Sequence, residues 1–374
     1  MGRIEWVIEN CRLLAAIGEE FERTTPFAGL TIGTGIHLEP KTVALLLTLQ
    51  RGGAELVSTG NLATTQQEAI DYLSARGVRV IGRPTRDPAE HDGYVWDVVR
   101  SRPHLLLDNG GDLFVRWLDD PYDGLLGGTE ETTSGRLRLE PLRERINLPL
   151  LVINDSPIKQ FAENRHAVGQ SVLESFIRIT NTSTNGKRIT VFGYGACGKG
   201  VAANFRNAYA VVSVVDSDPV ARLEAMLDGY LVPEREAALR DADVVITVTG
   251  AGGVVTAADA LLLKDGAILA NAGHFPWEID VAGLSDGVDV ESGDGITTLR
   301  LTDGRRVHVL ADGHMVNLAG PRPLGNSIES MDLGFALQAR CLEAVAQGTV
   351  GFEACVVPVP RAIDEAVARS FVSL

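Results

Sequence analysis

Short apolar runs rich in β-branched residues alternate with helical stretches along this chain, a pattern typical of parallel sheets covered by helices. In the first part of the chain the pattern predicts helices over residues 41–51 and 66–76. Strands are predicted over residues 30–33, 55–59, 78–82, 104–107 and 150–153. The predicted fold class is therefore α/β.

The alternation becomes more regular after a break at residues 181–186. Strands are predicted over residues 188–192, 211–215, 244–249 and 267–271. Helices are predicted from residue 198 and over 221–228, which is the outline of a nucleotide-binding βαβ unit. One long helix is expected before this unit, over residues 160–180, and another after it, over 328–346.

The length and net charge of the chain indicate how many domains it forms and exclude several classes of partner. A chain of 374 residues is too long for one ordinary core, so two domains are expected. Its 34 Lys and Arg residues stand against 49 Asp and Glu residues, and a net charge of −15 makes nucleic acid and anionic membranes poor partners. No apolar stretch approaches the ~20 residues that cross a bilayer, and the first residues do not resemble a signal peptide. Four scattered cysteines without a CxxC pair favour reduced cytoplasmic thiols over disulfides or a metal site.

A glycine-rich loop gives the strongest local signal. It follows the apolar strand at 189–192, opens a helix, and consists of Gly193, Tyr194, Gly195, Ala196, Cys197 and Gly198. Asp216 ends the next predicted strand, where its carboxylate favours NAD over NADP because a 2′-phosphate would meet a negative charge. A P-loop is the competing interpretation, but Gly200 stands where that motif needs a Ser or Thr hydroxyl for magnesium, so it is rejected.

Polar residues follow two predicted strands of the first part. The strand at 104–107 runs into Asp108–Asp112, and the strand at 150–153 runs into Asn154, Asp155 and Ser156. Such residues at the carboxyl ends of strands mark the sites of α/β folds, although Gly, Asn and Asp also form plain turns.

Five separated motifs resemble those of the adenosylhomocysteinases, NAD-dependent enzymes that cleave S-adenosylhomocysteine to adenosine and homocysteine. GYGACGKG at 193–200 resembles the family's GYGxVGKG, and NAGHFPWEID at 271–280 its NIGHFDxEID. The Asn-Asp-Ser triplet with Lys159 at 154–159 is similar to NDSxTK. GGTEETTSG at 127–135 is similar to SEETTTG, and LADGHMVNLA at 310–319 to LAEGRLVNL. The likeness extends from about residue 28 to residue 368.

The resemblance implies both an architecture and a reaction. A Rossmann NAD-binding domain over 166–322 would be inserted in a second α/β, substrate-binding domain made of 1–165 and 323–374. In the family, NAD oxidises C3′ of a nucleoside, the ketone acidifies the C4′ proton, and the carbanion expels the C5′ substituent before water adds and hydride returns. A nucleoside substrate and a homo-oligomer, a dimer or tetramer, are also implied.

The resemblance assigns catalytic roles residue by residue. Lys159 matches the base beside the 3′-hydroxyl, and Glu163 stands in place of a neighbouring Asp, although a solvated i,i+4 ion pair is the alternative for these two. Glu131 matches the acid that binds ribose hydroxyls, His274 a histidine near C3′ and the nicotinamide, and His37 a histidine near C5′.

Further residues are expected to bind the two small molecules. The substrate-binding candidates are Glu39, Lys41, Thr64, Asn164 and Asn326. The cofactor-binding candidates are Gly193, Gly195, Ala196, Cys197, Gly198, Asp216, Thr249, Gly250, Asn271, Gly273, His274 and Asn317.

Departures from the family pattern gather on the substrate side. The second Asp of LDDGGDL is Asn109, which cannot exchange protons near C5′, and Glu39 and Lys41 replace the Thr and Glu that face adenine. The gate motif GHP reads Gly-Asn-Ser at 325–327, without its histidine. The family's terminal KPxxYRY is absent, from which weaker NAD retention is expected.

Three interpretations follow. The leading hypothesis is an NAD-dependent nucleoside 4′,5′-dehydratase, of the type needed for exocyclic enol-ether nucleosides such as decoyinine (angustmycin), with Asn109 leaving the alkene as product. The second is a true S-adenosylhomocysteine hydrolase. The third is a non-catalytic, NAD-responsive binding protein, against which the retained Lys159 and His274 argue.

Overall fold

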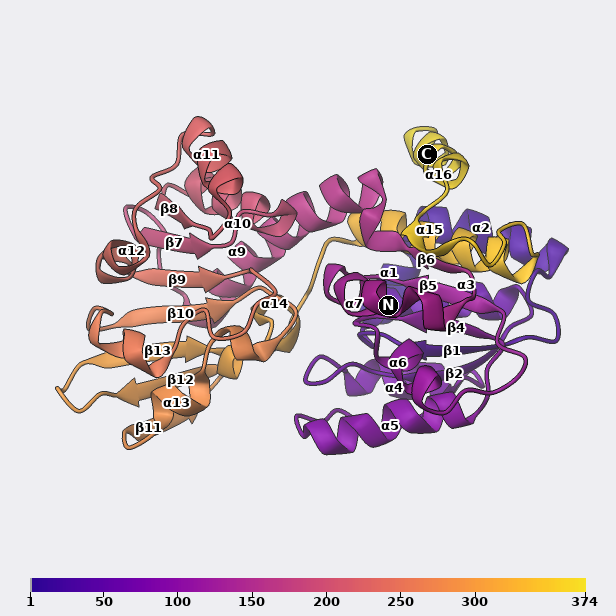
Figure 1. Ribbon diagram of the computed structural model, residues 1–374, viewed down its shortest axis with the longest axis horizontal. Coiled ribbons are helices and arrows are strands. Elements are labelled where there is room, and N and C mark those ends of the chain that lie inside the picture. The colour runs from indigo at the N-terminus through magenta and orange to yellow at the C-terminus, as the bar shows by residue number, and fades with distance from the viewer. Residues whose placement is uncertain (1) are drawn as a thin grey trace. The chain divides into compact units, whose positions relative to one another are not determined.

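The computed structural model describes residues 2–374, and the chain forms two compact units (Figure 1). The first unit contains the described residues up to Gln160 together with Ile328–Leu374, and the second is Phe161–Ser327. The boundaries lie at 160/161 and 327/328, where the sequence motifs had suggested 165/166 and 322/323.

The first unit is built on a sheet of seven strands among the described residues, in the order β14-β6-β5-β4-β1-β2-β3. Every pair of neighbours in it is parallel. The strands are β1 (Thr31–Gly35), β2 (Glu55–Thr59), β3 (Arg79–Val80), β4 (Leu105–Asp108), β5 (Gly127–Glu130), β6 (Leu150–Val152) and β14 (Cys355–Pro358). Leu105, Leu106 and Leu107 of the central strand β4 are fully buried, as a parallel sheet covered on both faces requires.

Helices cover both faces of this sheet (Figure 1). Helices α5 and α6 pack together on one face, and α2, α3 and α15 pack together on the other. The helices are α1 (Arg3–Asn10), α2 (Arg12–Thr24), α3 (Pro40–Arg51), α4 (Gln67–Ser74), α5 (Pro88–Arg100), α6 (Asp112–Asp119), α7 (Thr133–Leu139), α8 (Arg143–Ile146), α15 (Ile328–Ala346) and α16 (Arg361–Val372).

The second unit holds a mixed sheet in the order β11-β12-β13-β10-β9-β7-β8. Its strands are β7 (Arg188–Phe192), β8 (Val211–Val215), β9 (Val244–Thr247), β10 (Ala267–Asn271), β11 (Asp289–Gly293), β12 (Ile296–Arg300) and β13 (Arg306–Leu310). The order around β8, β7, β9, β10 and β13 is that of a Rossmann sheet, and these strands run parallel.

Strand β12 corrects the expectation that the sheets are parallel throughout, because it runs antiparallel to both β11 and β13. Asp294 and Gly295 join β11 to β12 with φ angles of 50° and 80°. Positive φ at both positions is the geometry of a two-residue hairpin turn, which forces an antiparallel pair. The Asp-Gly dipeptide was therefore a readable hairpin signal.

The helix expected as one piece over 160–180 has two parts. Residues Lys159–Ala167 have π-helical geometry and continue as α9 (Val168–Thr180). The remaining helices of the second unit are α10 (Ala196–Asn207), α11 (Pro219–Leu227), α12 (Arg235–Asp241), α13 (Val281–Ser285) and α14 (Val316–Ala319). Helices α9 and α10 touch backbone to backbone, since a Cβ on Gly169 would lie 2.3 Å from the Gly200 carbonyl oxygen. Within the described chain, no helix is long and apolar enough to cross a membrane.

Candidate active site

Asn109 and Glu131 meet at the carboxyl edge of the first sheet. They directly follow β4 and β5, which are paired so that Asp108 lies opposite Glu130. Asn109 and Glu131 are each 4% exposed. The sheet register thus brings together two loops that lie about twenty residues apart in the chain.

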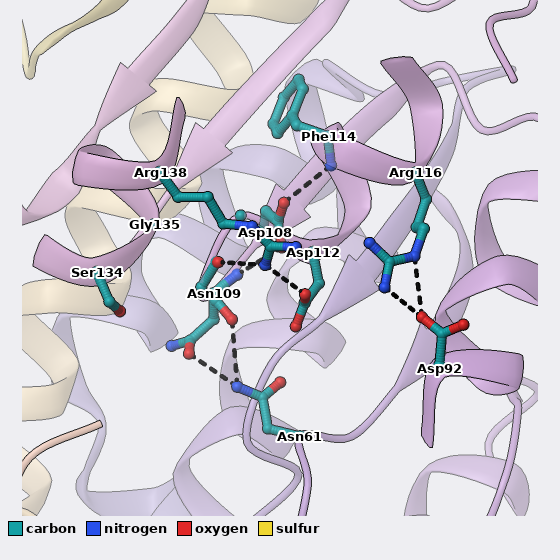
Figure 2. Close-up of polar contacts among 12 residues, drawn as sticks. Asn61, Asp92, Asp108, Asn109, Asp112, Phe114, Arg116, Ser134, Gly135 and Arg138 are labelled. Carbon is teal, nitrogen blue, oxygen red and sulfur yellow. Dashed lines mark hydrogen bonds and ion pairs between the residues drawn. The ribbon is translucent and has the colours of Figure 1, made fainter. Parts of the chain in front are cut away.

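Hydrogen bonds to Asn61 and Glu131 orient the Asn109 amide, and Figure 2 draws those to Asn61. Its Nδ2 donates to Glu131 Oε2 at 2.8 Å, and its Oδ1 accepts from Asn61 Nδ2 at 2.8 Å. The other Glu131 oxygen, Oε1, lies 2.9 Å from Lys159 Nζ. Asn109 therefore stands as a hydrogen-bond donor to a carboxylate, at the position where the motif that this loop resembles has an acid.

The charge of Glu131 is stabilised by its partners. Burial on its own would raise the pKa of this carboxyl, but the Lys159 ammonium and the Asn109 amide outweigh that effect and hold the pKa below its usual value. Glu131 is therefore an anion at neutral pH, suited to accept hydrogen bonds from ribose hydroxyls.

His37 joins the same cluster through Thr64. The His37 Nδ1 lies 2.7 Å from the Thr64 hydroxyl, which in turn lies 3.3 Å from the Asn61 carbonyl oxygen. The His37 backbone carbonyl accepts from the Thr42 hydroxyl at 2.6 Å. The structure thus brings His37, Thr64, Asn109, Glu131 and Lys159 into one region of the first unit, with Asn61 as a link that the sequence did not reveal.

Glu39 and Lys41, the residues at the expected base-reading position, form a buried ion pair. Their carboxylate and ammonium groups lie 2.7 Å apart, and each side chain is 4% exposed. A buried acceptor beside a buried donor can pair with the edge of a purine: the carboxylate accepts from a ring or amino N–H, and the ammonium donates to a ring nitrogen or carbonyl oxygen.

The glycine loop of the second unit has the geometry of a dinucleotide site. Gly193 has a φ of 102°, and a Cβ on it would lie 2.7 Å from the Val248 carbonyl oxygen. A Cβ on Gly198 would lie 2.0 Å from the Gly193 carbonyl oxygen, whereas one on Gly195 would meet nothing within 4 Å. The outer glycines are required by packing, and Gly195 leaves open space before the first turn of α10, which begins at Ala196 and includes Cys197.

Asp216 follows β8 and helps to shape the same loop. Its Oδ2 accepts from the Tyr194 backbone N–H at 2.6 Å, and its Oδ1 accepts from the Asp218 N–H at 2.9 Å. These bonds fix the carboxylate at the carboxyl end of β8, where an acid selects the ribose of NAD.

Glu278 holds the loop after β9 and is a residue that sequence reasoning missed. Its fully buried carboxylate accepts from the Thr249 N–H at 2.9 Å and the Gly250 N–H at 2.7 Å. A Cβ on Gly273 would lie 1.7 Å from Glu278 Oε1, so a larger residue there would displace this carboxylate from the loop that it holds. Burial raises the pKa of Glu278, and these donors oppose the rise. Its place in the matched NAGHFPWEID motif was the available signal.

The Asn271 side chain is hydrogen-bonded to the protein backbone. Its Nδ2 donates to the carbonyl oxygens of Phe275 and Gly313 at 2.7 and 2.9 Å, and its Oδ1 accepts from the Gly273 N–H at 2.7 Å. Asn271 therefore shapes the turn that carries His274, whose ring packs edge-on against Phe275 with centroids 4.7 Å apart.

Asn317 presents a polar atom that nothing in the described protein satisfies. It is 2% exposed, its Nδ2 donates to the Ser171 hydroxyl at 2.9 Å, and its Oδ1 has no hydrogen-bond partner among the described residues. Ser171 also donates to Asn326 Oδ1 at 3.0 Å, so Asn326, expected at the substrate, lies beside Asn317 in the second unit. An orphaned buried carbonyl fits an amide donor such as the nicotinamide carboxamide.

Two other candidates, Glu163 and Asn164, are 6% and 9% exposed in the π-helical segment. Lys159 and Glu163 are both buried, and this excludes the simple solvated ion pair that was considered for them. Among the described residues, no group of three metal-binding side chains occurs.

Comparisons with known proteins give the family. The model of the S-adenosyl-L-homocysteine hydrolase NAD-binding domain matches residues 164–322, and the model of S-adenosyl-L-homocysteine hydrolase matches residues 2–122. An adenosylhomocysteinase of Thermotoga maritima is 39% identical, over 98% of this chain and 92% of that protein. This chain belongs to the adenosylhomocysteinase family. It is an NAD-dependent enzyme of the adenosylhomocysteinase type, with an NAD-binding Rossmann domain.

Family members with two different names resemble the chain to a similar degree. An S-inosyl-L-homocysteine hydrolase of Methanopyrus kandleri is 37% identical over 98% of this chain and 88% of that protein. An adenosylhomocysteinase of Thermococcus kodakarensis is also 37% identical, over 98% and 89%.

Proposed function

We propose that this adenosylhomocysteinase-type enzyme removes water from a nucleoside, leaving a 4′,5′-unsaturated product. The substrate would be oxidised at C3′, lose its C4′ proton and expel the C5′ hydroxyl. The hydride taken from C3′ returns at the end, so the sequence is redox-neutral and its net change is loss of one water. Bound NAD supplies only that reversible hydride transfer.

The observation that carries the proposal is the bonding of Asn109. An amide whose Nδ2 donates to Glu131 and whose Oδ1 accepts from Asn61 has no proton to exchange. Activation of water for addition to the alkene needs a group that accepts a proton, and with the family's acid replaced here this task would fall to His37 without that acid's help. The 4′,5′-alkene would therefore outlast the step in which a hydrolase adds water.

The remaining polar groups fit the earlier steps. The contact between Glu131 and Lys159 sets a carboxylate beside an ammonium, so that the carboxylate can hold a ribose hydroxyl, and Lys159 can accept the hydroxyl proton after the ammonium has released one of its own. His37, bonded through Nδ1 to Thr64, is a carrier that can protonate the departing C5′ oxygen. With His37 as the acid for the leaving group, elimination does not require an acid at position 109.

Product analysis of the purified holoenzyme tests the proposal. The enzyme is incubated with adenosine, with ketose nucleosides and with S-adenosylhomocysteine, and the products are analysed by mass spectrometry. The expected product is a nucleoside lighter by one water. Rapid release of homocysteine from S-adenosylhomocysteine would contradict the dehydratase assignment.

An Asn109→Asp variant sharpens the same test. With the acid restored, water should add to the alkene, so heavy oxygen from labelled water should enter C5′ in the variant and not in the parent. Asn61→Asp is the matched control, because it adds a carboxylate to the same cluster without replacing Asn109. Equal labelling in the parent and in Asn109→Asp would show that Asn109 does not block addition.

The second candidate is hydrolysis of an S-nucleosyl-homocysteine, favoured by the Glu39–Lys41 pair. Glu39 can accept from an adenine amino group or from N1–H of a 6-oxopurine, while Lys41 donates to the neighbouring acceptor of either base. Parallel assays with S-adenosylhomocysteine and S-inosylhomocysteine separate this candidate from the first, because only hydrolysis releases homocysteine.

A further inference from the structure

Two carboxyl groups that take no part in the proposed chemistry lie side by side beneath the Asn109 loop. Asp108 ends β4, Glu130 ends β5, and the two residues are register partners on adjacent parallel strands, so their side chains point to the same face. Both residues are fully buried. Burial together with the Asp112 charge raises the pKa of Asp108 to about 7, and burial together with the Asp108 charge raises that of Glu130.

Their hydrogen bonds are unequal. Glu130 Oε1 accepts from the Gly110 N–H at 3.0 Å and from the backbone N–H and hydroxyl of Thr132 at 2.7 Å each. Its Oε2 accepts from the Gly111 N–H at 2.9 Å.

Asp108 accepts from the N–H groups of Asn109 and Phe114, at 2.9 and 3.0 Å (Figure 2). Four donors favour the charged form of Glu130, so Asp108 is the better holder of a proton.

These bonds determine where Asn109 lies. Gly110 and Gly111 have φ angles of 106° and 78°, a turn that would be mobile without an anchor. Glu130 holds both N–H groups of this turn, and a Cβ on Gly135 would lie 2.1 Å from its carboxyl carbon, so the carboxylate is enclosed on the far side as well.

Charged side chains on the elements around Asp108 and Glu130 have partners of their own. Asp112 of α6 pairs with Arg138 of α7 at 2.6 Å, and Arg138 also donates to the Gly110 carbonyl at 3.2 Å. Glu131, after β5, pairs with Lys159. On the packed helix α15, Asp332 accepts from the N–H groups of Leu13 and Leu14 in α2, and Arg340 pairs with Glu20 of α2 and with Glu343. Asp155, in the segment after β6, pairs with Arg136.

We infer that Asp108 and Glu130 are the positioning residues of the site, a carboxyl pair that shares one proton and clamps the 109–111 turn so that Asn109 reaches Glu131. With one proton on Asp108, only Glu130 of the two neighbouring residues is charged, and it keeps its four donors. When that proton is lost, two adjacent buried carboxylates repel each other, and the turn loses its anchor. Positioning of Asn109 should therefore weaken as the pH rises above neutrality.

The test compares Asp108→Asn with Glu130→Gln. Asparagine is uncharged, as protonated Asp108 is, and its single oxygen can keep the Phe114 N–H while the hydrogen bond from the Asn109 N–H is lost. Glutamine at 130 turns an accepting oxygen into a donor that faces backbone N–H groups. In the parent holoenzyme, hydrogen exchange of the Gly110 and Gly111 amides should accelerate above neutral pH by more than the intrinsic chemical rate of amide exchange does. That excess should disappear in Asp108→Asn, and in Glu130→Gln exchange should be at least tenfold faster throughout.

A kinetic measurement complements the exchange data. It rests on the proposed function only because adenosine is used as the probe. Appearance of reduced nicotinamide reports C3′ oxidation, a step shared by elimination and hydrolysis. In the parent its rate should fall by about tenfold per pH unit on the alkaline side. Asp108→Asn should shift that limb, whereas the control Asp332→Asn, a buried carboxyl that holds α2, should change the thermal midpoint and leave the limb in place.

Two results would overturn the inference: an unchanged alkaline rise of exchange in Asp108→Asn, or equal amide exchange in Asp108→Asn and Glu130→Gln. If no nucleoside reduces the cofactor, the proposed function fails, but the exchange data still decide whether the pair clamps the turn.

Discussion

Replacing Asn109 by Asp should destabilise the protein in a strongly pH-dependent way. In the parent, Asn109 Nδ2 donates to Glu131 Oε2 at 2.8 Å inside a buried cluster. An ionised Asp would set two carboxylate oxygens at that distance. Their repulsion is about 6 kcal/mol at an effective dielectric constant of about 20.

Protonation of one acid limits this loss. At pH 7, holding a proton on a carboxyl of ordinary pKa near 4 costs about 4 kcal/mol, which is less than the repulsion, so the pair takes up a proton. Whichever of the two acids holds the proton donates it to the other, as the Asn109 amide donated to Glu131. The loss in free energy of unfolding should thus be at most about 4 kcal/mol at pH 7 and about 1.4 kcal/mol at pH 5. The Lys159 ammonium beside Glu131 reduces both values.

Urea denaturation of the parent and the variant at the two pH values measures these losses. The sign follows from linkage: the native variant binds a proton that the unfolded chain releases above pH 4, so its stability falls as the pH rises. Asn10→Asp is the control, because this exposed amide donates to the Trp6 carbonyl and its change should cost about 0.5 kcal/mol or less at either pH. Equal losses for Asn109→Asp at pH 5 and pH 7 would refute the reasoning.

Three further predictions concern the rest of the machinery. Lys159→Ala should abolish turnover and leave the affinity for NAD within about twofold of the parent. It also leaves Glu131 buried without its cation, so the free energy of unfolding measured by denaturation should fall by about 3 kcal/mol. Glu278→Ala should release the Thr249 and Gly250 amides and weaken NAD binding by at least about tenfold in calorimetry, and unchanged affinity would contradict that role. Asp216→Ser should raise the affinity for NADP relative to NAD by about tenfold, and an unaltered ratio in fluorescence titration would show that this carboxylate does not read the ribose.

Regular elements and cofactor chemistry could be predicted from the sequence because their signals are local. The bounds of β2, β7, β8, β10 and α15 match the apolar runs from which they were predicted. The glycine loop and Asp216 are readable for the same reason, since strand, turn and acid follow one another along the chain.

The polar network of the first unit could not be predicted, because it is made by register. Asn61 reaches Asn109 across 48 positions, and the pairing of Asp108 with Glu130 depends on which strands are neighbours. No periodicity encodes either contact. The π-helical start at Lys159 is also invisible to a pattern that repeats every 3.6 residues.

The central claim is that a transient ketone at C3′ makes the C4′ proton removable. Incubation of the holoenzyme with a nucleoside substrate in deuterated water, followed by nuclear magnetic resonance of the recovered nucleoside, tests this claim most directly. The account predicts that deuterium replaces hydrogen at C4′ while the original hydrogen is retained at C3′, and that Lys159→Ala prevents the exchange. Product formation by the NAD-loaded enzyme from a 3′-deoxy substrate at an undiminished rate, or a product that keeps the C4′ hydrogen of the substrate, would contradict it.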